Sequence, residues 1–181
     1  MLKKERCLMI ARFQPLHYGH LNVLKYCYER CEEIVIVVGM SSQSHTPENP
    51  FTAGERILMI RESLKWSDLP LDRFITVTLP TIEVSRAAVH YVRLYSPPFK
   101  YIVVLNPIIQ RLFSEEGYNV IEPPPYNRSV LRGSIIRKMI ANGDNKWREI
   151  VPRTVVDIIE EIDGVNRIKM RYKEKLPEHY T

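Results

Sequence analysis

The sequence of 181 residues lacks any long apolar segment. No apolar run approaches the ~18 residues that a helix needs to cross a bilayer. The N-terminal residues, 1–6, carry basic side chains, but the apolar run that follows them, residues 7–11, is only five residues long. A signal peptide needs a longer apolar region than this. We therefore expect a cytoplasmic protein.

Cysteine is scarce, and the three that occur, Cys7, Cys27 and Cys31, leave at least one unpaired. The four-residue spacing of Cys27 and Cys31 on an expected helix would suit a metal. No other cysteine stands nearby and the helix is apolar at these positions, so we expect buried thiols instead. Internal repeats and low-complexity segments are also absent. We expect one domain over residues 1–181, with a core at 7–142, a helical C-terminal region at 147–168 and a basic tail at 169–181.

Charge is moderately positive, with a formal net charge of +5 and a pI of about 9.1. Much of this excess comes from five basic residues near the C-terminus: Arg167, Lys169, Arg171, Lys173 and Lys175. Such a charge permits nucleic-acid binding. A site for anionic nucleotides would draw positive charge as well, so charge alone leaves both interpretations open.

Apolar runs typical of buried strands alternate with helical patterns along the chain. We expect strands at 7–11, 34–39, 74–79, 101–105 and 119–121. Helices are expected to begin near 21 and 53 and to cover 84–95, 107–113, 133–141 and 154–162. This alternation predicts the α/β class, with a Rossmann-like open parallel sheet that has helices on both faces. Ligands bind beyond the carboxyl ends of the strands in such sheets.

Local signals mark several helix ends. Thr52 and Glu55 form a predicted capping box. Gly117 and Gly143 are expected to end helices, as is Gly164, and Thr154 is the expected N-cap of the last helix.

The most informative stretch is Arg12-Phe13-Gln14-Pro15-Leu16-His17-Tyr18-Gly19-His20, which lies where the first strand passes into a helix. A helix N-terminus offers unpaired N–H groups and the positive end of the helix dipole, and phosphate binds there readily. Histidines three residues apart can lie on one side of the helix and donate hydrogen bonds to phosphate oxygens. Gly19 lets the backbone approach a ligand closely.

Two further segments are candidates for the same site. The polar loop after the second strand contains Ser41, Ser42, Ser44 and His45 and leads into Asn49-Pro50-Phe51-Thr52-Ala53-Gly54-Glu55-Arg56. Arg56 suits either a phosphate or a structural pair with a carboxylate. The other segment joins Arg128 to Gly133-Ser134-Ile135-Ile136-Arg137, where a helix start and two arginines favour polyphosphate binding.

Together these motifs resemble the HxGH signature of the nucleotidylyltransferase superfamily, and in particular the archaeal-type nicotinamide-mononucleotide adenylyltransferases. Residues 49–56 are similar to that family's NPFTxGER element, and residues 132–137 to its ISxTxIR element, with Arg132 in place of the first serine. Residues 106–107 and 110–113 are similar to its NPxxQRLF element, with Leu105 in place of a preceding glycine. The resemblance extends from about Ile10 to Ile168.

The resemblance implies an enzyme of NAD biosynthesis that transfers AMP from ATP to nicotinamide mononucleotide, forming NAD and pyrophosphate. In-line attack of the acceptor phosphate on the α-phosphorus needs no covalent intermediate. The implied catalytic residues are His17, His20 and Arg137. The implied nucleotide-binding residues are Arg12, Phe13, Gln14, Gly19, Gly39, Asn106, Arg128, Gly133, Ser134 and Ile136. Mg²⁺ is expected to be held by substrate and water, because few carboxylates lie near the motifs. Archaeal family members are typically hexamers, so the resemblance implies a homo-oligomer. We expect no membrane partner and no nucleic-acid partner.

One region departs from the family pattern. Where the family reads the nicotinamide ring with an aspartate, an asparagine and a tryptophan, this chain has Thr81, Ser85 and Ala88. His90 or Tyr91 would be the substitute for the missing aromatic ring. Three alternatives therefore stay open: the same adenylyl transfer to another phosphorylated acceptor, a basic nucleic-acid-binding module without catalysis, and a nucleotide sensor that binds without turnover.

Overall fold

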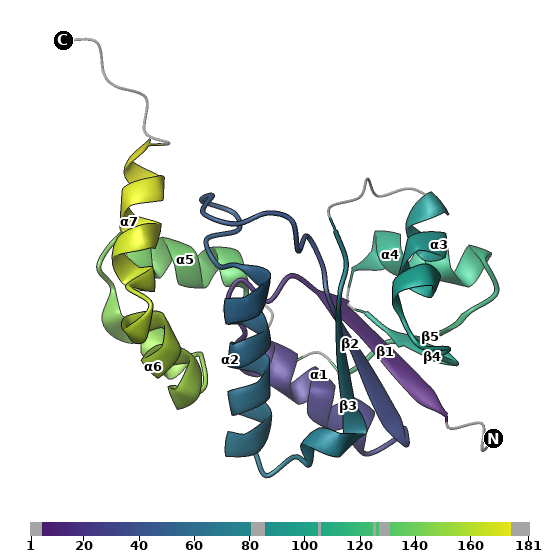
Figure 1. Cartoon of the computed structure of the whole chain (residues 1–181). Helices are drawn as coiled ribbons and strands as arrows, with labels where there is room; N and C mark the ends of the chain where they lie inside the picture. The colour runs from purple at the N-terminus through teal and green to yellow at the C-terminus, as the bar shows by residue number, and fades with distance from the viewer. Residues whose placement is uncertain (1–4, 81–85, 105, 125, 127–130, 175–181) are drawn as a thin grey trace.

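The computed structural model describes residues 5–80, 86–104, 106–124, 126 and 131–174. Its centre is a five-stranded, all-parallel sheet in the order β3-β2-β1-β4-β5 (Figure 1). The strands are β1 (Arg6–Ala11), β2 (Glu33–Val38), β3 (Phe74–Thr78), β4 (Tyr101–Val103) and β5 (Asn119–Ile121). The order reverses direction between β1 and β4, and ligands bind at such a switch point in open parallel sheets.

Helices cover both faces of the sheet, as the alternation of apolar runs predicted (Figure 1). On one face, α1 (Tyr18–Tyr28) and α2 (Ala53–Trp66) pack on β1 and β2 through residues such as Met9 and Ile36. On the other face, α3 (Arg86–Tyr95) and α4 (Pro107–Glu115) pack on the alternate side chains of the same strands, such as Leu8 and Val35. Central strands buried on both faces are apolar at nearly every position, which explains the continuous run in β2.

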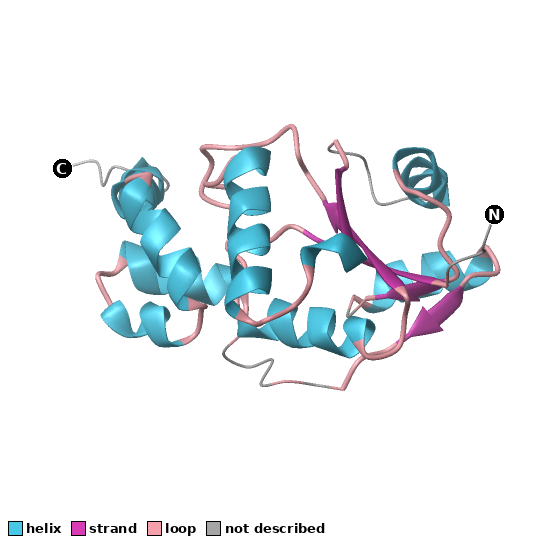
Figure 2. Ribbon diagram, turned by 60° about the horizontal axis from the view of Figure 1, so that its bottom comes forward, coloured by secondary structure: helices cyan, strands magenta, loops and turns pink. Residues whose placement is uncertain are grey.

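The C-terminal part of the chain adds a helical layer beside α2 (Figure 2). It consists of α5 (Gly133–Ala141), a 3₁₀ turn at Asn145–Glu149, α6 (Arg153–Glu161) and α7 (Gly164–Glu174); a further 3₁₀ turn, Leu71–Arg73, precedes β3. Trp147 is almost fully buried and joins this layer to the core beneath α2. Residues 169–174, expected at the start of a basic tail, belong to α7.

Most of the predicted helix ends are confirmed, and two are wrong. The Thr52–Glu55 capping box is present in both directions, and Gly117 and Gly143 have positive φ just beyond α4 and α5. Thr154 is not an N-cap, because Pro152 takes the extended N-cap position and α6 begins one residue earlier than Thr154. Gly164 does not end a helix.

Gly164 instead begins α7, and the preceding Asp163 takes the left-handed conformation at φ 55°. A β-carbon at position 164 would lie 2.9 Å from the Phe51 ring and 3.0 Å from the Ile159 carbonyl oxygen. The glycine is therefore needed for the close approach of α7 to α6 and to the segment before α2.

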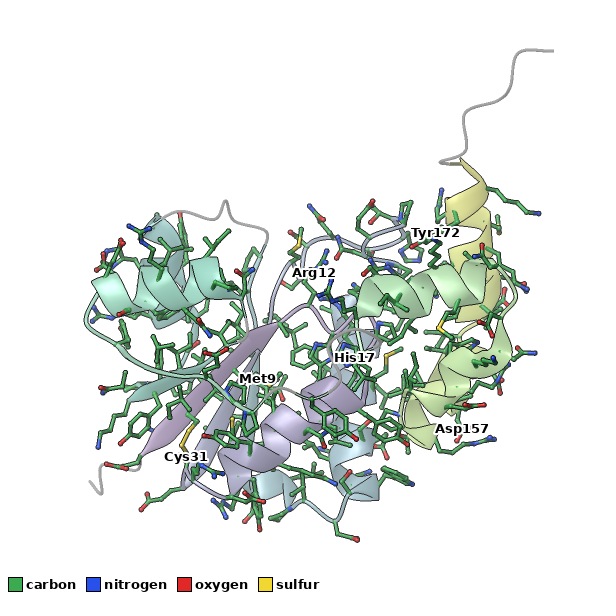
Figure 3. The ribbon with its side chains drawn as sticks, turned by 180° about the vertical axis from the view of Figure 1, so that it is seen from behind. Met9, Arg12, His17, Cys31, Asp157 and Tyr172 are labelled. Carbon is green, nitrogen blue, oxygen red and sulfur yellow. A yellow bond between two sulfur atoms is a disulfide. The ribbon has the colours of Figure 1, made fainter. Side chains whose placement is uncertain are left out.

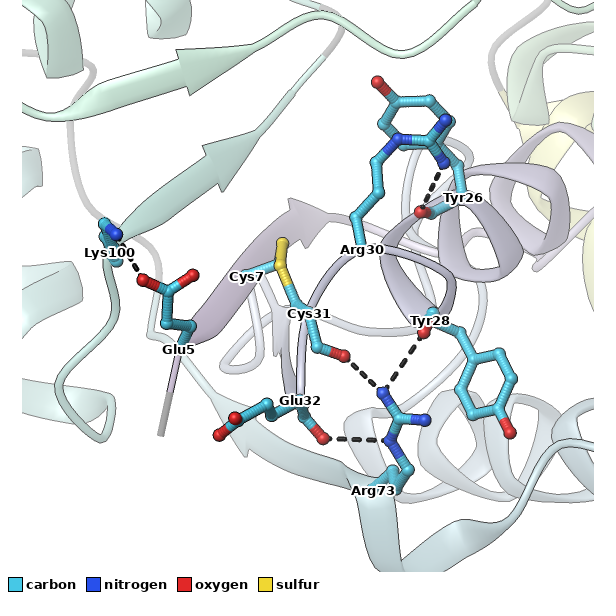
Figure 4. The surroundings of a disulfide bond; sticks show 9 residues. All are labelled: Glu5, Cys7, Tyr26, Tyr28, Arg30, Cys31, Glu32, Arg73 and Lys100. Carbon is cyan, nitrogen blue, oxygen red and sulfur yellow. Dashed lines mark hydrogen bonds and ion pairs between the residues drawn. A yellow bond between two sulfur atoms is a disulfide. The ribbon is translucent and has the colours of Figure 1, made fainter. Parts of the chain in front are cut away.

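Of the two buried thiols predicted at Cys27 and Cys31, the one at Cys31 is wrong, since a disulfide joins Cys31 to Cys7 (Figure 4). Helix α1 ends at Tyr28, so Cys31 lies beyond it and faces β1 at a Cα–Cα distance of 5.8 Å. Cys27 stays a free, buried thiol whose pKa burial raises to about 12. The disulfide lies at the end of β1 opposite to Arg12 (Figure 3). It closes a segment that contains β1, the histidine motif and α1, and crosslinks of this span stabilise a fold by about 3 kcal/mol.

Among the described residues, no helix combines the length and the apolar character needed to span a membrane.

Candidate active site

A cavity of about 920 Å³ lies at the carboxyl ends of β1 and β4, at the switch point of the sheet. It collects residues from four stretches that are distant in the sequence: the turn after β1 together with α1, the start of α4, the segment after β5 and the start of α5. Ten of the predicted site residues line it: Arg12, Phe13, Gln14, His17, Gly19, His20, Asn106, Gly133, Ser134 and Arg137.

Two other predicted site residues, Ile136 and Gly39, are not part of this wall. Ile136 is fully buried and packs in the core beneath the cavity. Gly39 follows β2, and its N–H donates to the Ala11 carbonyl, so it contributes to the strand ends and not to the cavity surface. Arg128 lies outside the described residues, as do Thr81 and Ser85 of the acceptor region. Ala88 lies on α3, away from the described cavity lining.

The two histidines form a stacked pair at the start of α1. Their ring centroids are 3.8 Å apart, and the Phe13 ring packs on His20 at 4.7 Å. Burial lowers the pKa of His17 to about 4. Burial, together with the neighbouring His17, also lowers the pKa of His20. Both rings are therefore neutral at pH 7, and both Nδ1 atoms are buried without a hydrogen-bond partner.

Two helices begin at the cavity without a side-chain cap. His17 is the N-cap of α1 and Arg132 that of α5, and neither side chain accepts a hydrogen bond from its helix. Gly133 permits a close approach here, since a β-carbon would lie 2.7 Å from the Gln14 carbonyl oxygen. The first N–H groups of a helix need external partners, and two such helix ends at one cavity favour an anionic ligand.

Two hydrogen bonds from one side chain hold the turn after β1 against the segment before α2. The Gln14 side-chain amide donates to the Phe51 carbonyl at 2.8 Å and accepts from the Phe51 N–H at 2.9 Å. Phe13 has a positive φ of 53°, which is uncommon for a residue with a bulky side chain. The paired amide keeps this turn in register with the loop before α2.

Arg137 is buried at the edge of the cavity, with only 4% of its surface exposed. Its Nη1 donates to the Gln14 carbonyl at 2.7 Å, and its Nε donates to the Pro47 carbonyl at 2.9 Å. Burial lowers its pKa from the usual value for arginine. The guanidinium thus ties the motif turn to the loop after β2 and lies close to the start of α5.

Arg56 binds neither a phosphate nor a carboxylate, the two roles that the sequence suggested. It is fully buried, and its guanidinium donates to the carbonyls of Arg12 and Gly39, both at 2.8 Å. Further bonds reach the carbonyls of Met40 and Thr52. Arg56 therefore fixes the carboxyl ends of β1 and β2 relative to α2. Burial lowers its pKa to about 10, so it keeps its charge at pH 7.

A protein-based metal site is not found in the part of the chain that the structure describes, where no group of three or more His, Cys, Asp or Glu could hold an ion. Glu29 is the only carboxylate among the described residues of the cavity wall. A metal at this cavity would need most of its oxygen ligands from a substrate and from water.

Residues 8–139 match the cytidylyltransferase-like family. The chain belongs to this family. It is 46% identical over 164 residues to a protein named nicotinamide-nucleotide adenylyltransferase from Ignicoccus hospitalis, covering 91% of this chain and 96% of that one. It is 45% identical over 164 residues to the protein of the same name from Saccharolobus solfataricus, covering 91% and 95%. The resemblance read from the HxGH motif is thereby confirmed.

Among solved structures, the fold matches that of a bifunctional NMN adenylyltransferase/ADP ribose pyrophosphatase from Francisella tularensis, complexed with AMP and a Mn ion, with a TM-score of 0.73. Identity is 19%, and the alignment covers 94% of this chain and 53% of that one, so this chain spans about half of its length. This similarity confirms the Rossmann-like fold.

The motifs did not identify several residues of the cavity wall. Asn22 and Tyr26 of α1 line it, and so do Pro123, Pro124 and Tyr126 after β5. Asn22 and Tyr26 lie three and seven residues beyond Gly19, on the face of α1 that continues from the motif. This helical spacing was the signal in the sequence that could have identified Asn22 and Tyr26 as neighbours of the motif. The spacing alone does not show that this face of the helix borders a cavity.

Proposed function

We propose that the protein transfers AMP from ATP to nicotinamide mononucleotide, giving NAD and pyrophosphate. The observation that carries the proposal is the meeting of two uncapped helix N-termini and the stacked histidine pair in one cavity at the switch point of the sheet. The names of the archaeal relatives support the same reaction. At the start of α1 the Tyr18 N–H already donates to the Ile150 carbonyl at 3.3 Å. An anionic triphosphate would accept from the N–H groups that remain at the two helix starts and from the histidine rings.

The chemistry fits direct transfer. A 5′-phosphate oxygen of the acceptor attacks the α-phosphorus of ATP in line, the bond from the α-phosphorus to the bridging oxygen breaks, and pyrophosphate leaves with that electron pair. The protein's part is to align the two substrates and to stabilise charge on the phosphate oxygens. His17 and His20 would donate to the ATP phosphates and to the transition state, and Arg137 and Arg128 would hold the β- and γ-phosphates. Arg12 would lie near the acceptor phosphate or the triphosphate.

The cavity wall fits a nucleotide that brings its own metal, because the described wall has a single carboxylate. Mg²⁺ would neutralise the triphosphate charge. The residues Arg12, Gly133 and Ser134 would then contact the phosphates directly. We further propose a cytoplasmic enzyme that acts as a homo-oligomer, as the resemblance implies, with no nucleic-acid partner.

A test of the arginine role compares the two substrates. Arg137→Ala should raise the KM for ATP roughly tenfold, the scale of one charge-assisted hydrogen bond, and should raise the KM for the acceptor less. Steady-state kinetics with each substrate varied in turn would measure both values. Lys138→Ala, the exposed neighbour on α5, is the matched control. Equal increases for both substrates would show that Arg137 acts only by anchoring the Gln14 and Pro47 carbonyls.

The deciding experiment for the function is pyrophosphate release from ATP with nicotinamide mononucleotide or nicotinic acid mononucleotide at matched concentrations. Thr81, Ser85 and Ala88 remove a carboxylate, an amide and an indole, and the lost hydrogen-bond pair and the lost stacking surface each cost about 1 kcal/mol. We expect turnover with nicotinamide mononucleotide, binding that is weaker by roughly tenfold or more, and relaxed discrimination against the nicotinic acid form. Turnover with neither, alongside turnover with another phosphorylated acceptor, would contradict the proposed substrate and retain the transfer chemistry.

A further inference from the structure

One polar side chain on the cavity wall has no partner within the protein and no role in the proposed transfer. Asn22 lies on α1, one turn beyond Gly19, and lines the cavity. Its side-chain nitrogen Nδ2 is buried and makes no hydrogen bond. Buried amides are nearly always paired, because an unpaired N–H costs free energy. Because Asn22 lines the cavity, a ligand bound there can supply the partner that the protein does not.

The position of Asn22 along the helix indicates which part of a ligand it meets. An α-helix rises about 1.5 Å per residue, so Asn22 lies roughly one turn deeper than the open N–H groups at the start of α1. The cavity continues in this direction, since Tyr26 and Glu29 of the next turns also line it. With the phosphates at the helix start, as in the proposed function on which this inference rests, the nucleoside end of the donor extends along this face.

The walls around Asn22 are suited to a flat ring. Val23 is buried on the helix side, and Pro123, Pro124, Tyr126 and Leu131 supply an apolar wall from the segments after β5 and before α5. A nucleobase stacks on apolar and aromatic surface and is distinguished by hydrogen bonds at its edge. Asn22 places an amide beside this apolar wall, and Lys25, Tyr26 and Glu29 add polar groups farther along the same helix.

We propose that Asn22 is a specificity-determining residue that reads the adenine ring of the nucleotide donor. Its amide oxygen accepts from the exocyclic amino group, and Nδ2 donates to N7, the bidentate pairing that asparagine makes with adenine. Hypoxanthine and guanine carry an oxygen where adenine has the amino group. They offer two acceptors at this edge, so one end of the amide stays unpaired. Asn22 therefore favours ATP over other purine triphosphates without taking part in the transfer.

Nucleotide binding tests this assignment without any need for turnover. Isothermal titration of the full chain should show ATP binding about tenfold tighter than inosine triphosphate. Asn22→Ala should remove most of this ratio, because ATP loses two hydrogen bonds to the amide and inosine triphosphate loses only one. In the wild-type protein, 7-deaza-ATP should bind like inosine triphosphate, because it lacks N7. In Asn22→Ala it should bind like ATP.

Two further variants show whether the loss of ATP preference is specific to the Asn22 amide. Lys25→Ala, on the same helix and the same cavity wall, should change ATP and inosine triphosphate affinities by a common factor. Asn22→Asp keeps the shape of the side chain but replaces the donor with an oxygen, so it should weaken ATP more than 7-deaza-ATP, even if Asn22→Ala does not fold. An ATP preference that is absent in the wild type, or that persists in both variants, would overturn the proposal. Absence of pyrophosphate release despite ATP binding would instead contradict the proposed function.

Discussion

Replacing His20 or His17 with alanine should lower kcat by roughly 100-fold or more, the scale of losing one preorganised donor to charge that develops in the transition state. The expectation rests on the stacked pair at the start of α1, with both Nδ1 atoms buried and unpaired in a cavity that suits a triphosphate. Pyrophosphate release at saturating ATP and acceptor would measure the loss.

The pH dependence of kcat/KM and of the free energy of unfolding gives a second test of the His17–His20 pair. Because burial lowers the pKa of His17 to about 4, the limb of the kcat/KM profile that belongs to His17 is expected near pH 4 and not near pH 6.5. Below pH 6.5 the unfolded chain binds protons on His17 and His20 that the folded protein does not. The free energy of unfolding should therefore fall as the pH is lowered from about 6.5 towards 4, and less so in His17→Ala.

Arg61→Ala is the control, since Arg61 is exposed on α2 and lies away from the described cavity wall. It should retain wild-type kcat and the wild-type pH dependence of stability. A folded His20→Ala protein with near-normal turnover would remove the proposed role of that ring. Circular dichroism and thermal unfolding of each variant would separate loss of catalysis from loss of structure.

The sequence predicts the order and type of the elements because those signals are local. The apolar run of β2 reflects burial on both faces, and the Thr52–Glu55 pair forms the expected capping box within one turn of α2. The placement of the motif at a strand end follows as well, because the carboxyl ends of parallel strands meet at one edge of the sheet. Arg12, His17 and Gly133 thus meet in one cavity, as expected.

The sequence predicts much less where partners come from distant segments. Arg56 looked equally suited to an anion, since nothing local shows that backbone carbonyls at Arg12 and Gly39 would surround it. The Cys7–Cys31 disulfide depends on how the start of β1 lies against the segment after α1. In the sequence, Asn22 is an ordinary polar position on an amphipathic helix. Only the fold shows that residues after β5 lie opposite this face of α1 and form a cavity with it.

Arg56→Ala should strongly destabilise the fold, lowering the free energy of unfolding by about 3 kcal/mol or more. It would leave the carbonyls of Arg12 and Gly39 buried without their donor and would open a cavity beneath the strand ends. Arg56→Lys should recover only part of the loss, because one ammonium cannot replace three nitrogens: Nη1 donates to the Arg12 and Gly39 carbonyls, Nη2 to the Met40 carbonyl and Nε to the Thr52 carbonyl.

Urea unfolding, followed by circular dichroism, would give the free energy of each variant. Arg61→Ala is the matched control: Arg61 lies on the same helix with more than half of its side chain exposed and should change stability by less than about 0.5 kcal/mol. The motif turn depends on the Arg12 carbonyl contact, so a folded Arg56→Ala protein should also bind ATP more weakly than Arg61→Ala does. Wild-type stability in Arg56→Ala would mean that water replaces the guanidinium, and that the strand ends hold the motif turn in place without it.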